Sequence, residues 1–257
     1  MRALRHSRYI TLRYLRAFLR EPAWVAISLT QPMIWLLLFG ALFKRVVEIP
    51  GFHSGSYVDF LTPGLVVMTA LSSAGWNGMA LIEDMQSGVL DRFLVSPVSR
   101  GSINVGSLAY LSVMVAVQSL VIVGIGLGLG AHFGGGVGGV VLLVAIACLL
   151  GTAIAALSNA LALVVRHRET LIGAVTSVTL PLTFVSSVFM QQSLAPGWIR
   201  WAARFNPVTW AVEASRSAAA SGTDWTLVGT RVALLAALLA ASTALATRAF
   251  GAYQRSL

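Results

Sequence analysis

Long apolar stretches without a charged residue, separated by short segments that carry arginines and acids, dominate the chain. The first stretch runs from Pro22 to Phe43 and the second from Phe60 to Ile82. Each has about the 20 residues that a helix needs to cross the hydrocarbon core of a bilayer. The third stretch, Gly101 to Val165, is long enough for two helices. We expect the turn between them in the glycine-rich run 134–139, because glycine disfavours helix and favours turns.

Two more helices are expected towards the C-terminus. The stretch from Thr170 to Ile199 should hold a fifth helix that ends near Gln191. The last apolar run lies between Thr226 and Thr247, with Arg231 near its outer end, from where a long side chain can extend to the interface. The pattern therefore predicts an all-α integral membrane protein with six transmembrane helices.

The composition supports this interpretation. The chain has 257 residues, of which 57% are hydrophobic and only 11% are charged, whereas a soluble domain carries about 25% charged residues. A soluble core of this size would not bury so much apolar surface, so the surplus is expected to face lipid. The length suits a single membrane domain over 1–257 and leaves no room for a second, soluble catalytic domain.

The distribution of positive charge predicts the orientation. With six crossings and both termini in the cytoplasm, the inner segments are 1–21, 83–100, 166–169 and 248–257. They hold twelve arginines, against six lysines and arginines in the outer segments, as the positive-inside rule requires. The net charge of +9 is therefore explained by topology, and no nucleic-acid partner is expected.

The N-terminal segment 1–21 has the pattern of an amphipathic helix. Five of its arginines fall within an arc of about 80° on a helical wheel, apart from an arc of leucines and phenylalanine. Such a helix is expected to lie along the inner membrane surface, with Arg13, Arg16 and Arg20 as interfacial anchors toward lipid phosphates or a partner. The alternative is a positive-inside anchor with no further role.

The outer segment 194–224 is too polar to span and too apolar for an ordinary loop. It contains Trp198, Trp201 and Trp210, and tryptophan favours the membrane interface. We predict two short re-entrant helices, broken at Asn206-Pro207, that dip into the outer leaflet. The alternative is an aromatic belt without a role in transport.

The inner segment 83–100 predicts a short amphipathic helix. Met85, Val89 and Phe93 are four residues apart and form one apolar stripe, and Pro97 ends the helix. A helix of this kind, exposed at the inner face, suits a groove on a partner protein. Its three acids disfavour the alternative, in which the helix lies flat on an anionic leaflet.

The chain lacks several motifs that carry chemistry. It has one lysine and no G-x-x-x-x-G-K-[ST] sequence, so it has no P-loop for ATP. The four histidines are far apart in the sequence, no G-x-S-x-G nucleophile elbow is present, and no predicted span has an ionisable residue near its middle. We therefore expect no catalytic, cofactor or metal site on this chain, and expect energy for any transport to come from another chain.

Three segments resemble one family. The stretch Glu83 to Arg100, with its Gly-Val-Leu-Asp-Arg-Phe-Leu-Val-Ser-Pro-Val-Ser-Arg core, is similar to the cytoplasmic loop of type-2 ABC exporter permeases, which include the daunorubicin-resistance and nodulation-factor export permeases. The stretch Phe205 to Arg216 resembles the Asn-Pro motif before the last helix of that family. The arginine-rich N-terminus followed by Arg20-Glu21-Pro22 also fits.

The resemblance implies a permease that exports a hydrophobic or amphipathic substrate such as a drug, lipid or glycolipid across the plasma membrane. It implies two copies of a cytoplasmic ATPase subunit, which carry ATP and Mg, and a second permease subunit that we expect to be identical. An ion-coupled transporter or a channel is the alternative. The family's motifs make the following residues candidates for ATPase coupling: Glu83, Gly88, Leu90, Asp91, Arg92, Phe93, Leu94 and Pro97. They make Asn206, Pro207, Glu213 and Arg216 candidates for an outer gate.

Overall fold

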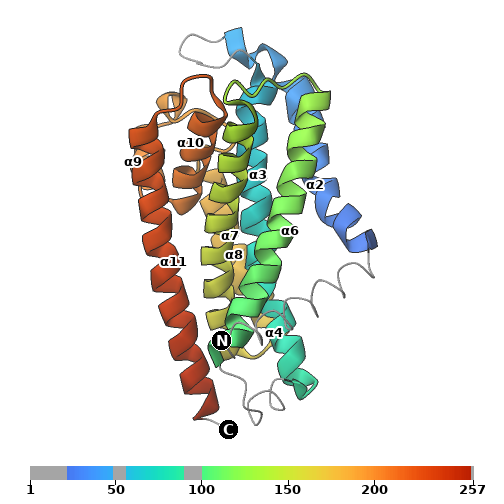
Figure 1. Ribbon diagram of the computed structural model, residues 1–257, viewed down its shortest axis with the longest axis vertical. Helices are drawn as coiled ribbons and strands as arrows, with labels where there is room; N and C mark the ends of the chain where they lie inside the picture. Colours follow the sequence, from blue (N-terminus) through green and yellow to red (C-terminus); the bar gives the residue numbers. More distant parts are fainter. Residues whose placement is uncertain (1–21, 49–55, 90–99, 256–257) are drawn as a thin grey trace.

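A computed structural model describes residues 22–48, 56–89 and 100–255, and these ranges contain helices and turns but no strand (Figure 1). In chain order the elements are α2 (Pro22–Leu42), the 3-10 helix η1 (Lys44–Glu48), α3 (Tyr57–Gly75), α4 (Asn77–Gln86), α6 (Arg100–Gly128), α7 (Gly136–Val165), α8 (Arg168–Phe184), the 3-10 helix η2 (Gln192–Leu194), α9 (Gly197–Ala203), α10 (Pro207–Ala219) and α11 (Trp225–Gln254).

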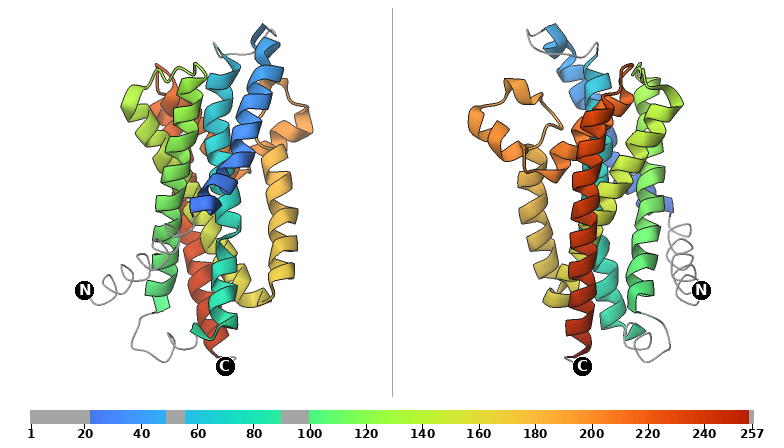
Figure 2. Two further views of the ribbon diagram at one scale, coloured as in Figure 1. Left: turned by 90° about the vertical axis from the view of Figure 1, so that its right-hand side faces the viewer. Right: turned by 60° about the vertical axis from the view of Figure 1, so that its left-hand side comes forward.

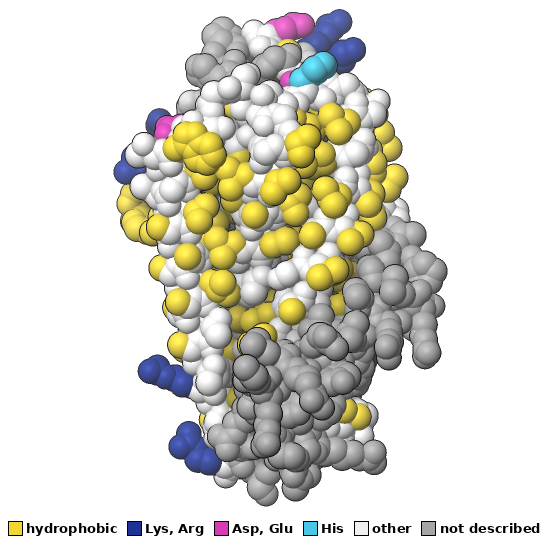
Figure 3. Space-filling model, viewed as in Figure 1, with side chains coloured by type: hydrophobic (Ala, Val, Ile, Leu, Met, Phe, Trp, Pro, Cys, Tyr) yellow, Lys and Arg dark blue, Asp and Glu magenta, His cyan; other side chains and the backbone are white. Residues whose placement is uncertain are grey.

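Four helical stretches are long and apolar enough to cross a membrane: Tyr57–Gln86, Asn104–Gly128, Gly136–Val165 and Trp225–Tyr253. A shorter apolar helix covers Ile27–Leu42. Large apolar side chains are exposed on the outside of the bundle, and charged side chains gather towards its two ends (Figure 3). These findings confirm the prediction of an all-helical integral membrane protein, because an apolar exterior of this extent suits lipid and not water.

Helix α7 is the centre of the bundle. It packs against α3, α6, α10 and α11, which surround it in the two further views (Figure 2). Leu143, Ile146 and Leu150 of α7 are almost completely buried. At the end of the bundle that the sequence predicts to face outward, called the outer end below, Gly135 and Gly139 lie so close to the Ala218 carbonyl of α10 that a Cβ at either position would clash with it. This spacing of small residues lets two helix backbones approach closely.

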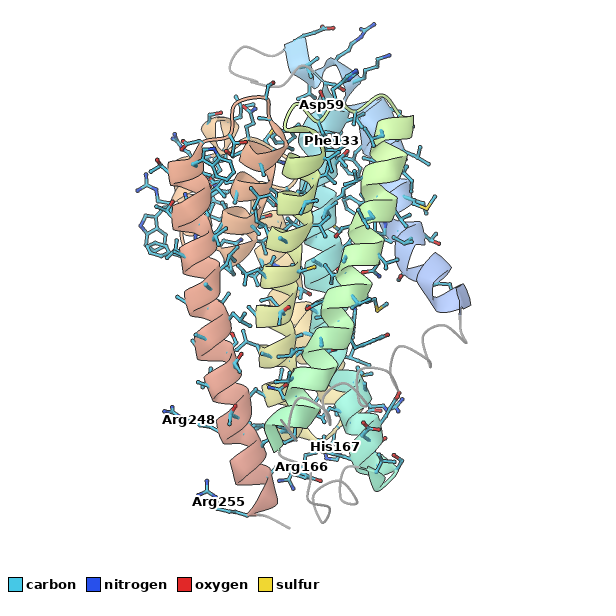
Figure 4. All side chains as sticks on the ribbon, in the orientation of Figure 1. Asp59, Phe133, Arg166, His167, Arg248 and Arg255 are labelled. Atoms are coloured by element: carbon cyan, nitrogen blue, oxygen red, sulfur yellow. The ribbon has the colours of Figure 1, made fainter. Side chains whose placement is uncertain are left out.

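The connections alternate between the two ends of the bundle. Helix α4, the turn between α7 and α8, and the C-terminal part of α11 lie at one end, together with Arg166, Arg248 and Arg255 (Figures 1 and 4). Helix η1, the turn between α6 and α7, and α9 lie at the other end. Of the segments predicted to face the cytoplasm, the described parts 83–89, 166–169 and 248–255 therefore lie at one end of the molecule.

Two predicted helices differ from the observed ones. The stretch predicted as one helix over Phe60–Ile82 bends at Trp76, where α3 ends and α4 begins. The amphipathic helix predicted to continue through 83–97 is interrupted: α4 ends at Gln86, and Gly88 has φ +66, a left-handed conformation that ends helices. Met85 and Val89 therefore do not lie on one continuous helix, and Phe93 lies outside the described residues.

The fifth helix is also shorter than predicted, because α8 ends at Phe184 and not near Gln191. The Ser186 hydroxyl donates to the Thr183 carbonyl at 2.5 Å and accepts the Val188 amide at 3.3 Å. Such local bonds from serine compete with the helical pattern. The last helix, in contrast, is longer than predicted, since α11 continues to Gln254.

A buried polar network fixes the joint between α3 and α4. The Asn77 amide donates to Ser107 Oγ at 2.8 Å and to Asn159 Oδ1 at 2.9 Å. Ser158 Oγ donates to the Gly75 carbonyl at 2.6 Å and accepts the Gly78 amide at 3.0 Å. The serine therefore satisfies the backbone groups that the bend frees, and the network ties the start of α4 to α6 and α7.

This joint allows a stability test. A Cβ at Gly78 would lie 2.6 Å from the Ser158 carbonyl and 2.8 Å from Ser158 Oγ. We expect Gly78→Ala to lower the free energy of unfolding by about 1–3 kcal/mol, because the backbones of α4 and α7 would have to separate. Thermal unfolding of the purified protein in detergent measures this effect. The matched control is Gly173→Ala on α8, where nothing lies within 4 Å of the new Cβ. Equal unfolding temperatures for both variants would contradict the predicted close packing.

Candidate functional site

The outer half of the bundle contains a segment of non-helical backbone, residues 185–191, between α8 and η2. Ser187 and Val188 in this segment are buried, with exposed fractions of 3% and 0%. Peptide groups at such a depth have no helical partners of their own and must be satisfied by other parts of the protein. Two side chains of the α10 region, Asn206 and Arg216, supply hydrogen bonds at this break.

Asn206 joins the end of α8 to the start of α10. Its Oδ1 accepts the Val208 amide at 2.9 Å, so it is the N-cap of α10, and Pro207 follows at the first helical position, where no amide hydrogen is needed. Its Nδ2 donates to the Leu182 carbonyl at 2.7 Å. One buried side chain therefore satisfies the beginning of one helix and the end of another, which explains an Asn-Pro pair at this position.

Arg216 holds the non-helical segment against α3. Its Nε donates to the Phe60 carbonyl at 3.0 Å and its Nη2 donates to the Val188 carbonyl at 2.8 Å. The guanidinium carbon lies 3.4 Å from the centroid of the Phe60 ring, a cation–π contact. Gly64 makes the arrangement sterically possible, because a Cβ there would lie 2.9 Å from the Val188 carbonyl oxygen.

The remaining predicted gate residue, Glu213, faces the last helix. Its Oε2 forms an ion pair with Arg231 Nη2 of α11 at 2.8 Å, and both side chains are about three-quarters buried. Three of the four predicted gate residues, Asn206, Glu213 and Arg216, thus contact neighbouring parts of the bundle: α8 with the segment after it, α3, and α11. The sequence analysis did not identify the close approach at Gly64 or the ion pair of Arg231. The sequence feature that indicates this ion pair is an arginine inside an otherwise uncharged run.

Aromatic side chains attach α2 to the same segment. Phe189 packs against both Trp35 and Phe39 of α2, with ring centroids 5.0 and 5.6 Å away. The Tyr57 hydroxyl of α3 donates to the Phe189 carbonyl at 3.2 Å. The break after α8 is therefore held from three sides, by α2, α3 and α10.

An open cavity of about 540 Å³ lies above these contacts at the outer end of the bundle. We call it the outer cavity. Buried Phe60, Ser187 and the half-buried Arg216 line its inner part, and exposed His132, Ala220 and Ser221 line its rim. Its other lining residues are Asp59, Gly134, Gln191, Gln192, Glu213, Ala219 and Leu227. Figure 4 labels Asp59 near the outer end, where its Oδ1 accepts the His132 amide at 2.8 Å.

At the opposite end, Glu83 on α4 forms an ion pair with Arg168 at the start of α8, at 2.8 Å. Both side chains are substantially exposed, so this pair contributes little to stability. Gly88 follows in a turn with positive φ. The other predicted coupling residues, Leu90, Asp91, Arg92, Phe93, Leu94 and Pro97, lie outside the described residues, as do the predicted interfacial anchors Arg13, Arg16 and Arg20.

An apolar helical bundle whose outer half contains a broken, internally hydrogen-bonded helix defines a multi-pass membrane protein. The sequence identifies the family within this class: the model of the family described as ABC-2 type transporter matches residues 6–219. The chain therefore belongs to the ABC-2 type transporter family.

Individual relatives agree with this assignment. The chain is 31% identical over 198 residues to the transport permease ycf38 of Cyanophora paradoxa, covering 77% of this chain and 68% of the relative. It is 30% identical over 206 residues to a daunorubicin resistance ABC transporter permease of Streptomyces coeruleorubidus, covering 79% and 71%. It is 25% identical over 212 residues to a doxorubicin resistance ABC transporter permease of Mycobacterium tuberculosis, covering 82% and 76%.

The outer contacts of Arg216 can be tested by substitution. In Arg216→Met the Phe60 and Val188 carbonyls would lose a charged donor, and we expect the free energy of unfolding to fall by at least about 2 kcal/mol. We also expect faster amide hydrogen exchange across residues 185–191, because the segment loses its attachment to α10. The control is Arg200→Met, since Arg200 is exposed on α9. Unchanged exchange in the Arg216 variant would show that other contacts hold the segment.

Proposed function

We propose that this chain is the membrane-spanning permease subunit of an ATP-driven exporter that moves a hydrophobic or amphipathic substrate out of the cytoplasm or the inner leaflet. The observation that carries the proposal is the family match over residues 6–219 in a chain whose sequence has no P-loop. ATP and Mg then belong to a separate cytoplasmic ATPase subunit, present in two copies. A second permease subunit, identical to this one, completes the transporter.

The proposed topology has six crossings with both termini in the cytoplasm, in the cell membrane. The four long apolar stretches support four crossings, and α2 and α8 are proposed as the first and fifth. Helix α8 has 17 residues and is short for a span, but the segment 185–191 continues from its end at Phe184 towards the outer face. Helices α9 and α10 then form the proposed outer re-entrant segment, within 194–224.

The proposed docking site for the ATPase is the segment 83–100, with Asp91, Arg92 and Phe93 among its coupling residues. Two observations support this. Helix α4 leads into the segment at the end of the bundle that carries Arg166 and Arg248 (Figure 4), the side expected inside by the positive-inside rule. The network at Asn77 also ties the start of α4 to α6 and α7, so a force on the segment would reach the bundle.

The proposed outer gate consists of Asn206, Pro207, Glu213 and Arg216. All four belong to α10 or its N-cap, and three of them bond to different neighbouring parts of the bundle. A shift of α10 would therefore change the contacts of α3, α8 and α11 together. The drug-resistance permeases among the relatives support an exported amphipathic substrate as the cargo.

The coupling role predicts a loss of partner binding on charge reversal. We expect Asp91→Lys or Arg92→Glu to weaken retention of the co-expressed ATPase subunit at least tenfold, about 1.4 kcal/mol, in co-purification and binding assays. Stimulation of ATP hydrolysis by the permease should fall in parallel. The control is Arg248→Glu, an exposed charge reversal at the same end of the bundle.

Two outcomes would contradict the proposal. Full ATPase binding and full transport by the Asp91 and Arg92 variants would remove the segment 83–100 from the coupling interface. Transport by this chain alone in vesicles, driven by an ion gradient and without ATP, would favour the alternative of an ion-coupled transporter or channel.

A further inference from the structure

The outer cavity contains two opposite charges that are not neutralised by an ion pair. Among the described residues, Arg216 bonds to two backbone carbonyls and to no carboxylate, and Asp59 accepts one backbone amide and contacts no cationic group. Both residues line the same cavity, but they do not pair with each other. The third charged lining residue, Glu213, forms its ion pair with Arg231 and also attracts the Arg216 charge, without an ion pair between the two. The cavity therefore presents a positive group and a negative group that are kept apart.

The inner part of the cavity offers unused hydrogen-bond capacity. A guanidinium group has five N–H donors, and the two bonds of Arg216 leave three of them. Ser187 is 3% exposed, lines the cavity, and its Oγ has no hydrogen-bond partner within the described part of the chain. A buried hydroxyl without a partner is costly, and a ligand with acceptor oxygens would satisfy it together with the guanidinium.

These charges select the chemistry of a ligand. Of the charged residues that line the cavity, Arg216 can attract an anionic group and Asp59 can attract a cationic group. A zwitterion whose anionic and cationic groups are a few ångströms apart would compensate both. Arg216 presents a planar set of donors suited to phosphate oxygens, and Asp59 presents carboxylate oxygens suited to an ammonium group.

The position of the cavity indicates the source of such a zwitterion. Gln191 and Gln192 line the cavity, and the same stretch of chain continues through η2 into α9, where Trp198 and Trp201 are exposed. Exposed tryptophans of a membrane protein lie at the level of the lipid headgroups. We propose that the outer cavity binds the zwitterionic headgroup of a phospholipid, with the phosphate at Arg216 and Ser187 and the ammonium group at Asp59.

The site does not depend on ATP-driven transport, so binding is tested on the purified full chain in detergent without nucleotide. The probes for calorimetry are glycerophosphoethanolamine, which has both charges, glycerophosphoglycerol, which has only the phosphate, and ethanolamine, which has only the amine. We expect saturable binding of the first probe and at least tenfold weaker binding of the other two. Equal affinities for the three probes, or no saturable binding of the first, would overturn the proposal.

Three variants locate the site. Asp59→Asn removes the charge but keeps an oxygen that can accept the His132 amide, and we expect it to reduce the affinity for glycerophosphoethanolamine at least fivefold. Ala220→Trp, a substitution at the exposed rim, should block binding without disturbing the core. The control is Glu48→Gln, which removes an exposed acid of η1 that does not line the cavity. Unfolding temperatures close to that of the parent chain would show that the variants are folded, and unchanged binding in both Asp59→Asn and Ala220→Trp would overturn the assignment.

A last measurement identifies the source of the headgroup. In nanodiscs that contain equal amounts of phosphatidylethanolamine and phosphatidylglycerol, native mass spectrometry should show retained phosphatidylethanolamine, and Asp59→Asn should abolish this preference. Equal retention of the two lipids would contradict the proposal that the cavity selects a zwitterionic lipid headgroup.

Discussion

The hydrocarbon core of a bilayer offers no water with which to satisfy an interrupted helix, and the outer half of this molecule is organised around that constraint. The backbone between α8 and η2 leaves the helical path while Val188 is fully buried. Arg216 donates a hydrogen bond to the Val188 carbonyl, and Asn206 donates one to the Leu182 carbonyl. The Phe189 carbonyl accepts a hydrogen bond from the Tyr57 hydroxyl. A charged side chain is tolerated at this depth because it replaces the missing backbone donors and rests on the ring of Phe60.

The same contacts make the outer elements depend on one another. Arg216 reaches α3 and the broken segment, Asn206 reaches the end of α8, and Glu213 reaches α11, although all three belong to α10 or its cap. Helix α10 itself packs along α7, the central helix. With 13 residues, α10 and its cap thus contact α3, α7, α8 and α11.

The sequence predicted the parts of this fold that local composition controls. Uncharged apolar runs predicted helices at the positions of α2, α6, α7 and α11. The Asn-Pro pair predicted the break between α9 and α10, because proline lacks an amide hydrogen and asparagine caps helices. The end of α8 was placed too late, since it depends on Ser186 and on Asn206, which is distant in the sequence. The bend at Trp76 was missed because Ser158 and Asn159, on another helix, supply its hydrogen bonds. The ion pair of Arg231 likewise depends on how α10 and α11 pack, which no local pattern contains.

The contact between α7 and the Ala218 carbonyl limits how two such chains can meet in a membrane. Glycines four residues apart are a common surface for self-association of membrane helices from separate chains. Here Gly135 and Gly139 are covered by α10 of their own chain, and α7 packs against α3, α6, α10 and α11. The surface formed by these two glycines is therefore already occupied by contacts within the subunit. A transporter built from two copies would therefore be joined through the peripheral helices, and its symmetry axis would pass outside the most tightly packed part of either subunit.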